Sequence, residues 1–421
     1  MANEFSKEER VAFEQMLEGF NDALVLSRYV SKYRPGDTDM ERANDVIWRP
    51  QPYVAQSFDG LDQTANFNDS TQLSVPATLG FVKSSPFILD AKELRDALQE
   101  NRLGDAARQK LASDVNVAIM AVAANQGTLV VKQTAAASGY DDVALCEAIM
   151  NEQGVTMANR AIALSTRSYN GMASNLAGRE TMNTKPVAAY ERGYVGRIAS
   201  FDTLKLDYAN RITAAAGGVG KTMSTLPAAV NYYTPVASRV AVTGERGNVD
   251  NRYQTVTWSS TTNVVAGDCF TVAGVNAVHH ITKGNTGQLK TFRVISVDSG
   301  TTVTISPPII SNQGGTDAEA QYQNCVVTVS ATAAIVFLNT VAADINPFWH
   351  KDALEILPAR LAVPTDAGVQ VMRGTTDQGL ELVLQKFYDI NTAKTKFRAD
   401  TFFGVVNKQP EMSGLILFSQ T

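Results

Sequence analysis

The sequence predicts an α+β protein that carries an all-β domain inserted into its middle. In long segments of the first half, apolar residues recur every three or four positions, which is the spacing of one helix face. Residues 214–338 instead alternate apolar with polar residues in short runs separated by Gly, Asn, Asp and Pro. After residue 346 the mixed pattern returns, so the chain resumes the fold that it left at the insertion.

Composition narrows the class of protein. Of the 421 residues, 44% are hydrophobic and 19% are charged, which is typical of globular proteins. Because single cores stop growing at roughly 250–300 residues, this length predicts two or three domains. No apolar run approaches the roughly 18 residues of a membrane span, and the first residues lack the pattern of a signal peptide, so we expect no export. A net charge of -5 without a basic block does not indicate tight binding to nucleic acid.

The N-terminal third predicts a helix, a strand and a long connection. Residues 5–33 have a helical apolar spacing and form either an arm that packs on another subunit or a helix folded back on its own domain. Residues 46–48 predict a strand. Residues 50–80 contain neither Lys nor Arg. They include four large apolar side chains whose exposure to water would be unfavourable: Tyr53, Phe58, Leu61 and Phe67. A hairpin laid on a neighbour and disorder in the isolated subunit are the two alternatives for this connection.

The longest helix is predicted from Asp90, with Glu93 at the spacing of a capping box, to a stop at Gly127. At 1.5 Å per residue it would span roughly 50 Å, with Gly104 as a point where it can bend. Basic residues gather in its first half: Lys92, Arg95, Arg102, Arg108 and Lys110. A strand at 129–131, a helix at 142–153 and a strand at 161–164 follow, and closing strands are predicted at 380–384, 402–406 and 415–418.

The insertion predicts a small antiparallel barrel or sandwich with two prominent loops. Residues 244–252 form a turn with charges of both signs, and residues 311–324 form the second loop. Just before the strands, residues 216–222 come close to a phosphate-binding loop that ends in Lys221 and Thr222. Such a loop needs a helix after the lysine, but Pro227 follows closely, so a flexible linker is the better interpretation.

Residues for catalysis or metal binding are not indicated. The three histidines do not share ligand spacing with a Cys or a carboxylate, and Ser and Cys nucleophiles lack a signature context such as GxSxG. Cys146, Cys269 and Cys325 are widely spaced and predict buried, reduced thiols. We therefore expect no enzyme, no cofactor and no metal. A nucleotide-binding enzyme would explain one heptapeptide, and a carbohydrate-binding or adhesin module would explain the β insertion alone.

Several segments, taken in order, resemble the major coat protein of short-tailed double-stranded DNA bacteriophages. That family combines the tailed-phage capsid fold with a telokin-like, immunoglobulin-like insertion. The matching positions are Asn44, Ile47, Trp48 and Pro50; Arg192, Gly193, Val195, Arg197, Ala199, Phe201 and Asp202; Asn248 to Arg252, Thr255, Val256 and Thr257; Gly267, Asp268, Phe270, Ala273, Gly274 and Val275; Phe348, Trp349, Asp352, Ala353 and Ile356; and Gly404, Val405, Asn407, Pro410 and Glu411.

The resemblance implies a division of the chain into the parts of a capsid subunit. These are an N-arm (1–45), an extended loop with flanking strands (46–82), the spine helix and peripheral domain (83–165), a first part of the axial domain (166–221), the β-barrel insertion domain (222–338), and a second part of the axial domain with closing peripheral strands (339–421). It also implies that the charged loop of the insertion reaches a neighbouring capsomer, through Glu245, Arg246, Asp250 and Arg252.

For the extended loop, the expected contacts with a neighbour are Phe58, Asp59, Asp62, Phe67 and Asp69. Because its carboxylates need a basic partner surface, the first half of a neighbour's spine helix is predicted, at Arg95, Arg102 and Arg108. Residues 50–82 contain no Lys, so a shell without a lysine crosslink is expected.

The function implied by the resemblance is that of a major capsid protein. Its copies would assemble as hexamers and pentamers, with a scaffolding protein and a portal, into an icosahedral shell of T=7 geometry. The phage DNA would be enclosed without sequence-specific binding. Assembly would take place in the bacterial cytoplasm, without a membrane partner, and the product would be the virion capsid.

Overall fold

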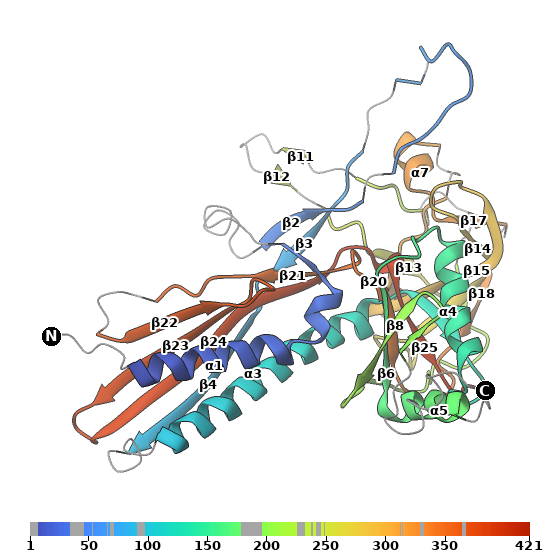
Figure 1. The fold of residues 1–421 in the computed structure, drawn as a ribbon. Coiled ribbons are helices and arrows are strands. Elements are labelled where there is room, and N and C mark those ends of the chain that lie inside the picture. Colours follow the sequence, from blue (N-terminus) through green and yellow to red (C-terminus); the bar gives the residue numbers. More distant parts are fainter. Residues whose placement is uncertain are drawn as a thin grey trace. The chain divides into compact units, whose positions relative to one another are not determined.

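The computed structural model describes residues 7–33, 46–52, 54–64, 66–67, 71–90, 97–177, 196–224, 232–236, 239–240, 246–247, 249–311, 313, 315–328, 332–363 and 368–421. The chain forms two compact units, shown as a ribbon in Figure 1. Unit 1 comprises residues 1–47, 77–121 and 355–406, and unit 2 comprises residues 48–76, 122–354 and 407–421. Each unit is therefore assembled from segments that are distant in the sequence.

A six-stranded sheet forms the centre of unit 1. Its order is β1-β21-β24-β23-β22, and β4 also pairs with the long strand β24. The strands are β1 (Ser31–Lys32), β4 (Phe81–Asp90), β21 (Leu354–Pro358), β22 (Gln370–Thr375), β23 (Glu381–Asp389) and β24 (Lys394–Asn407). Stacked pairs across β4 and β24 fix the register, with ring centroids 5.4 Å apart for Phe81 and Phe403 and 5.1 Å apart for Phe87 and Phe397.

One face of this sheet is covered by two helices, α1 (Lys7–Ala23) and α3 (Ala97–Gln126), which run along each other in Figure 1. The N-terminal helix is thus folded back on its own unit, which decides between the two alternatives left open by the sequence. It is also shorter than predicted, because it ends at Ala23 and a 3-10 turn (Leu26–Tyr29) leads into β1. Side chains from elsewhere in unit 1 satisfy its last carbonyls: Asn116 donates to Ala23 O and Gln378 to Leu24 O.

The segment before the spine helix also differs from the prediction. Asp90 was expected to start the helix, but it is the last residue of β4, and α3 is described from Ala97. The ten residues of β4 lie opposite β24 in an unbroken antiparallel register, which outweighs the local capping signal. The predicted end of the helix is confirmed, since α3 stops at Gln126 directly before Gly127 and continues through Gly104.

A mixed sheet forms the middle layer of unit 2, in the order β5-β25-β20-β6-β8-β7. Its strands are β5 (Leu129–Lys132), β6 (Arg160–Ser165), β7 (Arg197–Ile198), β8 (Phe201–Leu206), β20 (Asn346–His350) and β25 (Ser413–Leu417). Helices α4 (Tyr140–Glu152) and α5 (Thr166–Ala177) cover one face and share a core with Leu129, Ile162 and Ile416. On the other face, Val130 and Leu415 pack with Cys269 of the insertion.

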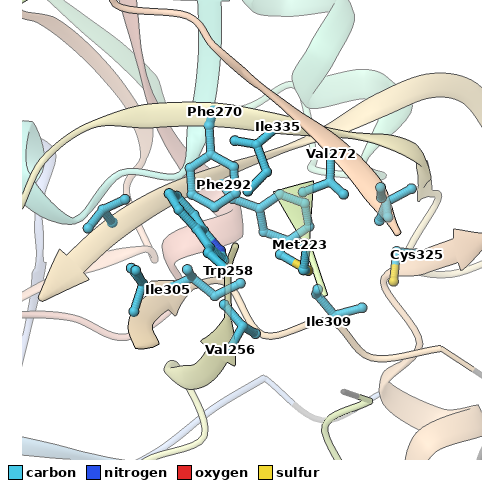
Figure 2. Close-up of a cluster of buried hydrophobic side chains, with 14 of the residues drawn as sticks. Met223, Val256, Trp258, Phe270, Val272, Phe292, Ile305, Ile309, Cys325 and Ile335 are labelled. Atoms are coloured by element: carbon cyan, nitrogen blue, oxygen red, sulfur yellow. The ribbon is translucent and has the colours of Figure 1, made fainter. Parts of the chain in front are cut away.

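The insertion is a small closed barrel. Its strands follow the order β10-β18-β14-β15-β16-β13, and a bridge between Met223 and Trp258 joins the two outer strands. The strands are β10 (Thr222–Met223), β13 (Gln254–Thr257), β14 (Cys269–Val278), β15 (Asn285–Val297), β16 (Thr302–Ser306) and β18 (Ala333–Phe337), with β17 (Cys325–Val327) paired to β14. Figure 2 shows the core, in which Trp258, Phe270 and Phe292 pack together. The loop predicted at 311–324 contains a short helix, α7 (Asp317–Tyr322).

The barrel is joined to the mixed sheet by two connections that pair with each other. Strand β9 (Arg211–Ile212) enters the insertion and strand β19 (Ala343–Asp344) leaves it, and the two are antiparallel neighbours. The insertion therefore begins and ends at neighbouring positions. The host sheet can form on either side of it, as it would around a surface loop. The smaller hairpins β2–β3 (Val46–Pro50, Ser74–Thr78) and β11–β12 (Arg239–Val240, Arg246–Gly247) complete the description.

The close packing of β25 against β5 in the mixed sheet can be tested at Gly414. A Cβ built on Gly414 would lie 2.2 Å from the carbonyl oxygen of Leu129 on β5, so Gly414→Ala should destabilise the protein by about 1–3 kcal/mol. Gly104→Ala is the matched control, since its Cβ would meet nothing within 4 Å and helix propensity favours alanine by about 1 kcal/mol. Urea unfolding of the purified subunit measures both. An unchanged midpoint for Gly414→Ala would contradict the predicted close packing.

Candidate assembly surfaces

The extended loop, the segment between β2 and β3, carries apolar side chains that its own subunit leaves in solvent. Leu61 is 106% exposed, Phe67 is 88% exposed and Phe58 is 48% exposed. Asp59 and Asp62 lie beside them and are exposed as well. Asp69 lies outside the described residues. Exposed apolar groups of this size, mixed with carboxylates, indicate a surface that another molecule covers.

The tip of the loop is nevertheless organised by its own polar contacts. Gln63 donates from Nε2 to the carbonyl oxygen of Gly60 at 2.6 Å, where Gly60 has a φ of 102° that only glycine adopts without strain. Asp62 accepts from the Thr64 hydroxyl at 2.6 Å and from the Thr64 amide at 3.1 Å. These hydrogen bonds, the side-chain one first, lower the pKa of Asp62 and keep its carboxylate charged. The tip therefore presents a turn of defined shape.

The base of the loop is fixed on the insertion barrel. Gln321 of α7 donates to Val54 O at 2.8 Å, and the Tyr322 hydroxyl donates to Thr71 O at 2.8 Å. Leu73 packs with Ile310 and Tyr322 in a small apolar cluster. The sequence did not reveal this support, because α7 was taken as part of a loop; its capping box at Thr316 and Glu319 is the signal that would have found it.

The basic residues predicted on the spine helix have different surroundings. Arg102 is exposed on α3 and remains available to a partner. Arg108 is half-buried, forms an ion pair with Asp105 at 3.4 Å and packs against Gly19, where a Cβ would lie 1.9 Å from its Nη1. Arg95 lies outside the described residues. Of the described pair, Arg102 alone presents an exposed cation.

A second basic surface lies on the sheet face of unit 1 opposite the helices. On β4, Val82 and Ile88 are each about half exposed, and Phe387 on β23 is 45% exposed. The exposed cations Lys394, Lys396 and Arg398 of β24 lie beside these apolar groups, and a hollow of about 300 Å³ opens between Ile88, Phe387 and Lys396. Lys396 pairs with Asp389 at 3.4 Å and Arg398 with Asp400 at 2.7 Å, but both side chains stay half exposed. This surface, called here the outer sheet face, combines apolar area with cations, whereas the exposed part of the loop combines apolar area with anions.

The charged turn of the insertion is engaged inside the subunit at two of its four predicted contact residues. Arg252 is 7% exposed, forms an ion pair with Asp250 at 2.8 Å and donates from Nη1 to Asn407 O at 2.7 Å. Its buried guanidinium therefore already has partners in its own chain. Glu245 lies outside the described residues, and Arg246 is described only through its backbone pairing with Val240. The contact with a neighbouring capsomer stays a prediction for Glu245 and Arg246.

The segment that resembles a phosphate-binding loop has a structural role. Lys221 is 7% exposed, and its ammonium donates to Ser260 O at 3.1 Å and to Thr262 O at 2.9 Å. Strand β10 starts directly afterwards, at the position where a phosphate-binding loop would begin its helix. Because the lysine charge is held by carbonyl groups of the barrel, it does not face a site for phosphate, and the segment is an ordered entry strand.

The barrel is joined to the mixed sheet by buried ionic contacts around Glu411. The Glu411 carboxylate contacts the Lys290 ammonium, lies 3.4 Å from His280 Nε2 and accepts from Asn324 Nδ2 at 3.1 Å. Burial alone would raise the pKa of this carboxyl, but Lys290 and His280 together hold it below its ordinary value. Burial also lowers the pKa of the nearby Lys283 to about 8. The sequence did not reveal this cluster, since Glu411 is distant from its partners along the chain.

Chemistry other than assembly has little support in the described part of the chain. The three cysteines are buried, and burial raises the pKa of Cys269 to about 11 and of Cys325 to about 12, which keeps these thiols protonated. Among the described residues, groups of His, Cys, Asp or Glu that could hold a metal ion are absent. None of the described helices has both the length and the apolarity to cross a bilayer.

Comparison with known proteins agrees with a shell protein. A family model described as "P22 coat protein - gene protein 5" matches residues 1–419. The chain belongs to the P22 coat protein family. As a member of this family it is a major capsid protein of a tailed phage with the tailed-phage capsid fold, and the family is a structural and not an enzyme class. Its copies self-assemble into the capsomers of the icosahedral shell that encloses the phage DNA, and it is part of the virion.

Solved phage structures are similar to this coat protein. A structure from Mycobacterium phage Che8 has 11% sequence identity and a TM-score of 0.44, covering 93% of this chain and 90% of that chain. The capsid structure of the cyanophage P-SCSP1u also has 11% identity and a TM-score of 0.44, with 93% and 87% covered. The CUS-3 coat protein I-domain is 40% identical over 28% of this chain and 95% of its own, with a TM-score of 0.21.

The Glu411 cluster predicts that the stability of the coat protein decreases in acid. Because the pKa of Glu411 is lower in the folded state than its unfolded value of about 4.3, its stabilising effect is present above roughly pH 4.3 and is lost as the pH falls through the folded value. We expect the free energy of unfolding to fall more steeply below about pH 4 in the wild type than in Glu411→Gln. Urea unfolding at a series of pH values measures this, and parallel pH profiles would contradict it.

Proposed function

We propose that this coat protein builds a T=7 shell together with a separate scaffolding protein and a portal, in the host cytoplasm, by inserting its extended loop into a neighbouring subunit. The observation that carries the proposal is the exposure of Leu61 and Phe67 on a loop whose turn at residues 60–64 is held by its own hydrogen bonds. The resemblance to coat proteins of short-tailed phages supports the T=7 geometry, the scaffolding protein and the portal. The DNA is enclosed without sequence-specific binding, in agreement with the net charge of -5.

A separate scaffolding protein is supported by the surroundings of the N-terminal helix. Helix α1 has 17 residues, and Phe13, Met16 and Phe20 bury its apolar face in unit 1. Lys386 contacts Glu9, and Asn21 donates to Asp377 at 2.9 Å. Since this helix is occupied by its own unit, the described N-terminal segment does not leave a free helix to act as an internal scaffold.

The partner of the extended loop is a basic surface of the next subunit. Asp59 and Asp62 need cations once a neighbour covers them, and unit 1 has two candidate surfaces for this: the spine helix at Arg102, with Arg95 as a sequence prediction, and the outer sheet face at Lys394 and Lys396. The outer sheet face also offers apolar contacts for the loop's exposed side chains, through Val82, Ile88 and Phe387. For this reason we favour the outer sheet face, with the spine helix as the second candidate.

Contacts between capsomers are proposed at the remaining charged residues of the insertion turn. Glu245 and Arg246 precede the buried pair of Asp250 and Arg252, which fixes the base of the turn. Such exposed ion pairs contribute only about 0–1 kcal/mol each, so their role is to set the geometry of a contact that is repeated over the shell.

Charge reversal distinguishes the two candidate surfaces. The double change Asp59→Lys and Asp62→Lys should reduce assembly with the scaffolding protein, measured by sedimentation and electron microscopy, while the free energy of unfolding of the subunit stays within about 0.5 kcal/mol of the wild type. Combining it with Lys394→Glu and Lys396→Glu should restore shells if the loop lies on the outer sheet face. Restoration by Arg95→Glu and Arg102→Glu instead would place the loop on the spine helix, and normal shells from the Asp59 and Asp62 variant alone would reject both.

The mature shell should be held without a covalent crosslink through the extended loop. Residues 50–82 contain no Lys, so this loop cannot supply the amine of an isopeptide bond. Expanded shells that are boiled in detergent should give one band at the subunit mass of 45.4 kDa on a denaturing gel. A ladder of covalent multimers would contradict this expectation.

A further inference from the structure

One short segment of the chain holds both the insertion barrel and the base of the extended loop. Residues 407–412, called here the anchor segment, precede the closing strand β25. From the barrel, Arg252 donates to Asn407 O at 2.7 Å, and Lys290, His280 and Asn324 contact Glu411. From the loop base, Gln51 donates from Nε2 to Lys408 O at 3.2 Å. Two elements that are distant in the sequence are therefore positioned by the same backbone.

The loop base also depends on the barrel directly. Helix α7 supplies the two hydrogen bonds from Gln321 and Tyr322 to Val54 O and Thr71 O. This helix is held in place because Glu319 accepts from the Thr234 hydroxyl at 2.6 Å and Asn324, just after the helix, donates to Glu411. A movement of the barrel relative to the anchor segment would thus pull on the loop at several points.

We infer that Glu411 is the positioning residue that fixes the barrel on the mixed sheet and, through α7, the extended loop. Its partners His280, Lys290 and Asn324 belong to three separate segments of the barrel. Because one carboxylate contacts all three, the barrel cannot rotate about any one of these contacts without breaking the others. Without it, the Lys290 ammonium, only 2% exposed, would keep the neutral Gln153 Oε1 at 3.4 Å as its hydrogen-bond acceptor. A buried charge without an opposite partner is strongly unfavourable, and the barrel would shift to hydrate it.

The structure has room for such a shift beside Glu411. A cleft of about 230 Å³ lies between the loop base, the barrel and the anchor segment. Val54, Pro308 and Met412 line its three sides, and His280, whose Nε2 lies 3.4 Å from Glu411, forms part of its wall. Because the three walls belong to the three parts that Glu411 ties together, any loosening of the cluster opens this cleft and separates the loop base from the barrel.

Hydrogen exchange of the full-length subunit, resolved by mass spectrometry, tests the inference. Three amides report on it: Gln51, bonded to Leu73 O at 2.8 Å; Thr71, which faces Gln321 Oε1; and Val130, which donates to Thr291 at the barrel–sheet interface. In Glu411→Gln all three should exchange about tenfold faster or more, whereas the amides of the barrel core around Phe270 stay protected. Glu152→Gln is the control, because it makes the same chemical change at an exposed residue of α4 in the same unit; it should match the wild type at these amides.

The double variant Lys290→Met with Glu411→Gln removes both charges and should restore much of the protection that the single variant loses. This rescue separates a charge effect from general misfolding, even if the single variant unfolds. The inference is overturned if Val130 exchanges faster but Gln51 and Thr71 do not, if none of the three changes, or if the double variant is as unprotected as the single one.

The consequence for shell formation rests on the proposed role of the extended loop. Glu411→Gln should reduce the yield of assembled shells about tenfold while the double variant regains it. If the exchange data show the coupling but shells form normally, the coupling stands and the proposed docking of the loop fails. If Asp59→Lys with Asp62→Lys blocks assembly but Glu411→Gln changes neither exchange nor yield, the docking stands and the inference about Glu411 fails.

Discussion

The buried carboxylate of Glu411 is the contact on which the arrangement of unit 2 depends. A domain inserted into another fold is tied to it covalently at only two points, here the paired strands β9 and β19. Two adjacent connections alone act as a hinge, so the barrel needs a third point of attachment away from them. Glu411 and its neighbours in the anchor segment supply that point, directly before the strand β25 that closes the host sheet. A segment near the end of the chain thereby positions a domain that was synthesised before it.

Strand β15 contributes to the barrel core with one set of side chains and to the contact with the host sheet with the other. Phe292 faces the barrel core, whereas its neighbours Thr291 and Arg293 point to the host side. Thr291 donates to Thr128 O at 2.7 Å, and Arg293 donates to the carbonyl oxygens of Ala124 and Gly127 at the end of α3. These contacts satisfy the free carbonyls at a helix C-terminus with a cation and a hydroxyl. The interface is consequently polar and specific, whereas the core inside the barrel is apolar.

This arrangement explains which parts of the fold could be predicted from the sequence. The insertion was recognisable as an all-β region because several of its strands, such as β13 and β16, alternate apolar with polar residues, and the ends of α3 and α4 were marked by glycines. The same alternation hid the interface, since buried Thr291 and Arg293 give the same pattern as residues facing water. Strand β4 and helix α7 were missed because their local signals are short and their pairing partners are distant in the sequence.

Some of the candidate contact residues could likewise be predicted from the sequence, and others could not. The exposure of Phe58, Leu61 and Phe67 follows from a stretch that has apolar residues but no regular periodicity, so the sequence could indicate it. The fate of Arg252 could not be inferred, because a charged turn gives the same sequence signal whether its arginine pairs across an interface or inside the chain. Only the fold brings Arg252 to the carbonyl of Asn407, 155 residues further along the chain.

The free energies of burial and of ion pairing assign different roles to the apolar and the acidic side chains of the extended loop. Burying a Leu or Phe side chain is worth about 1.5–3 kcal/mol, whereas an exposed ion pair is worth about 0–1 kcal/mol. Leu61 and Phe67 can therefore supply most of the affinity for a neighbour, and Asp59 and Asp62 select the surface and the register. Because Thr64 and Gln63 already hold the tip in shape, little conformational entropy is lost on docking. A loop of this kind binds weakly as a single contact, and it becomes stable when each subunit both gives and receives one around a closed ring.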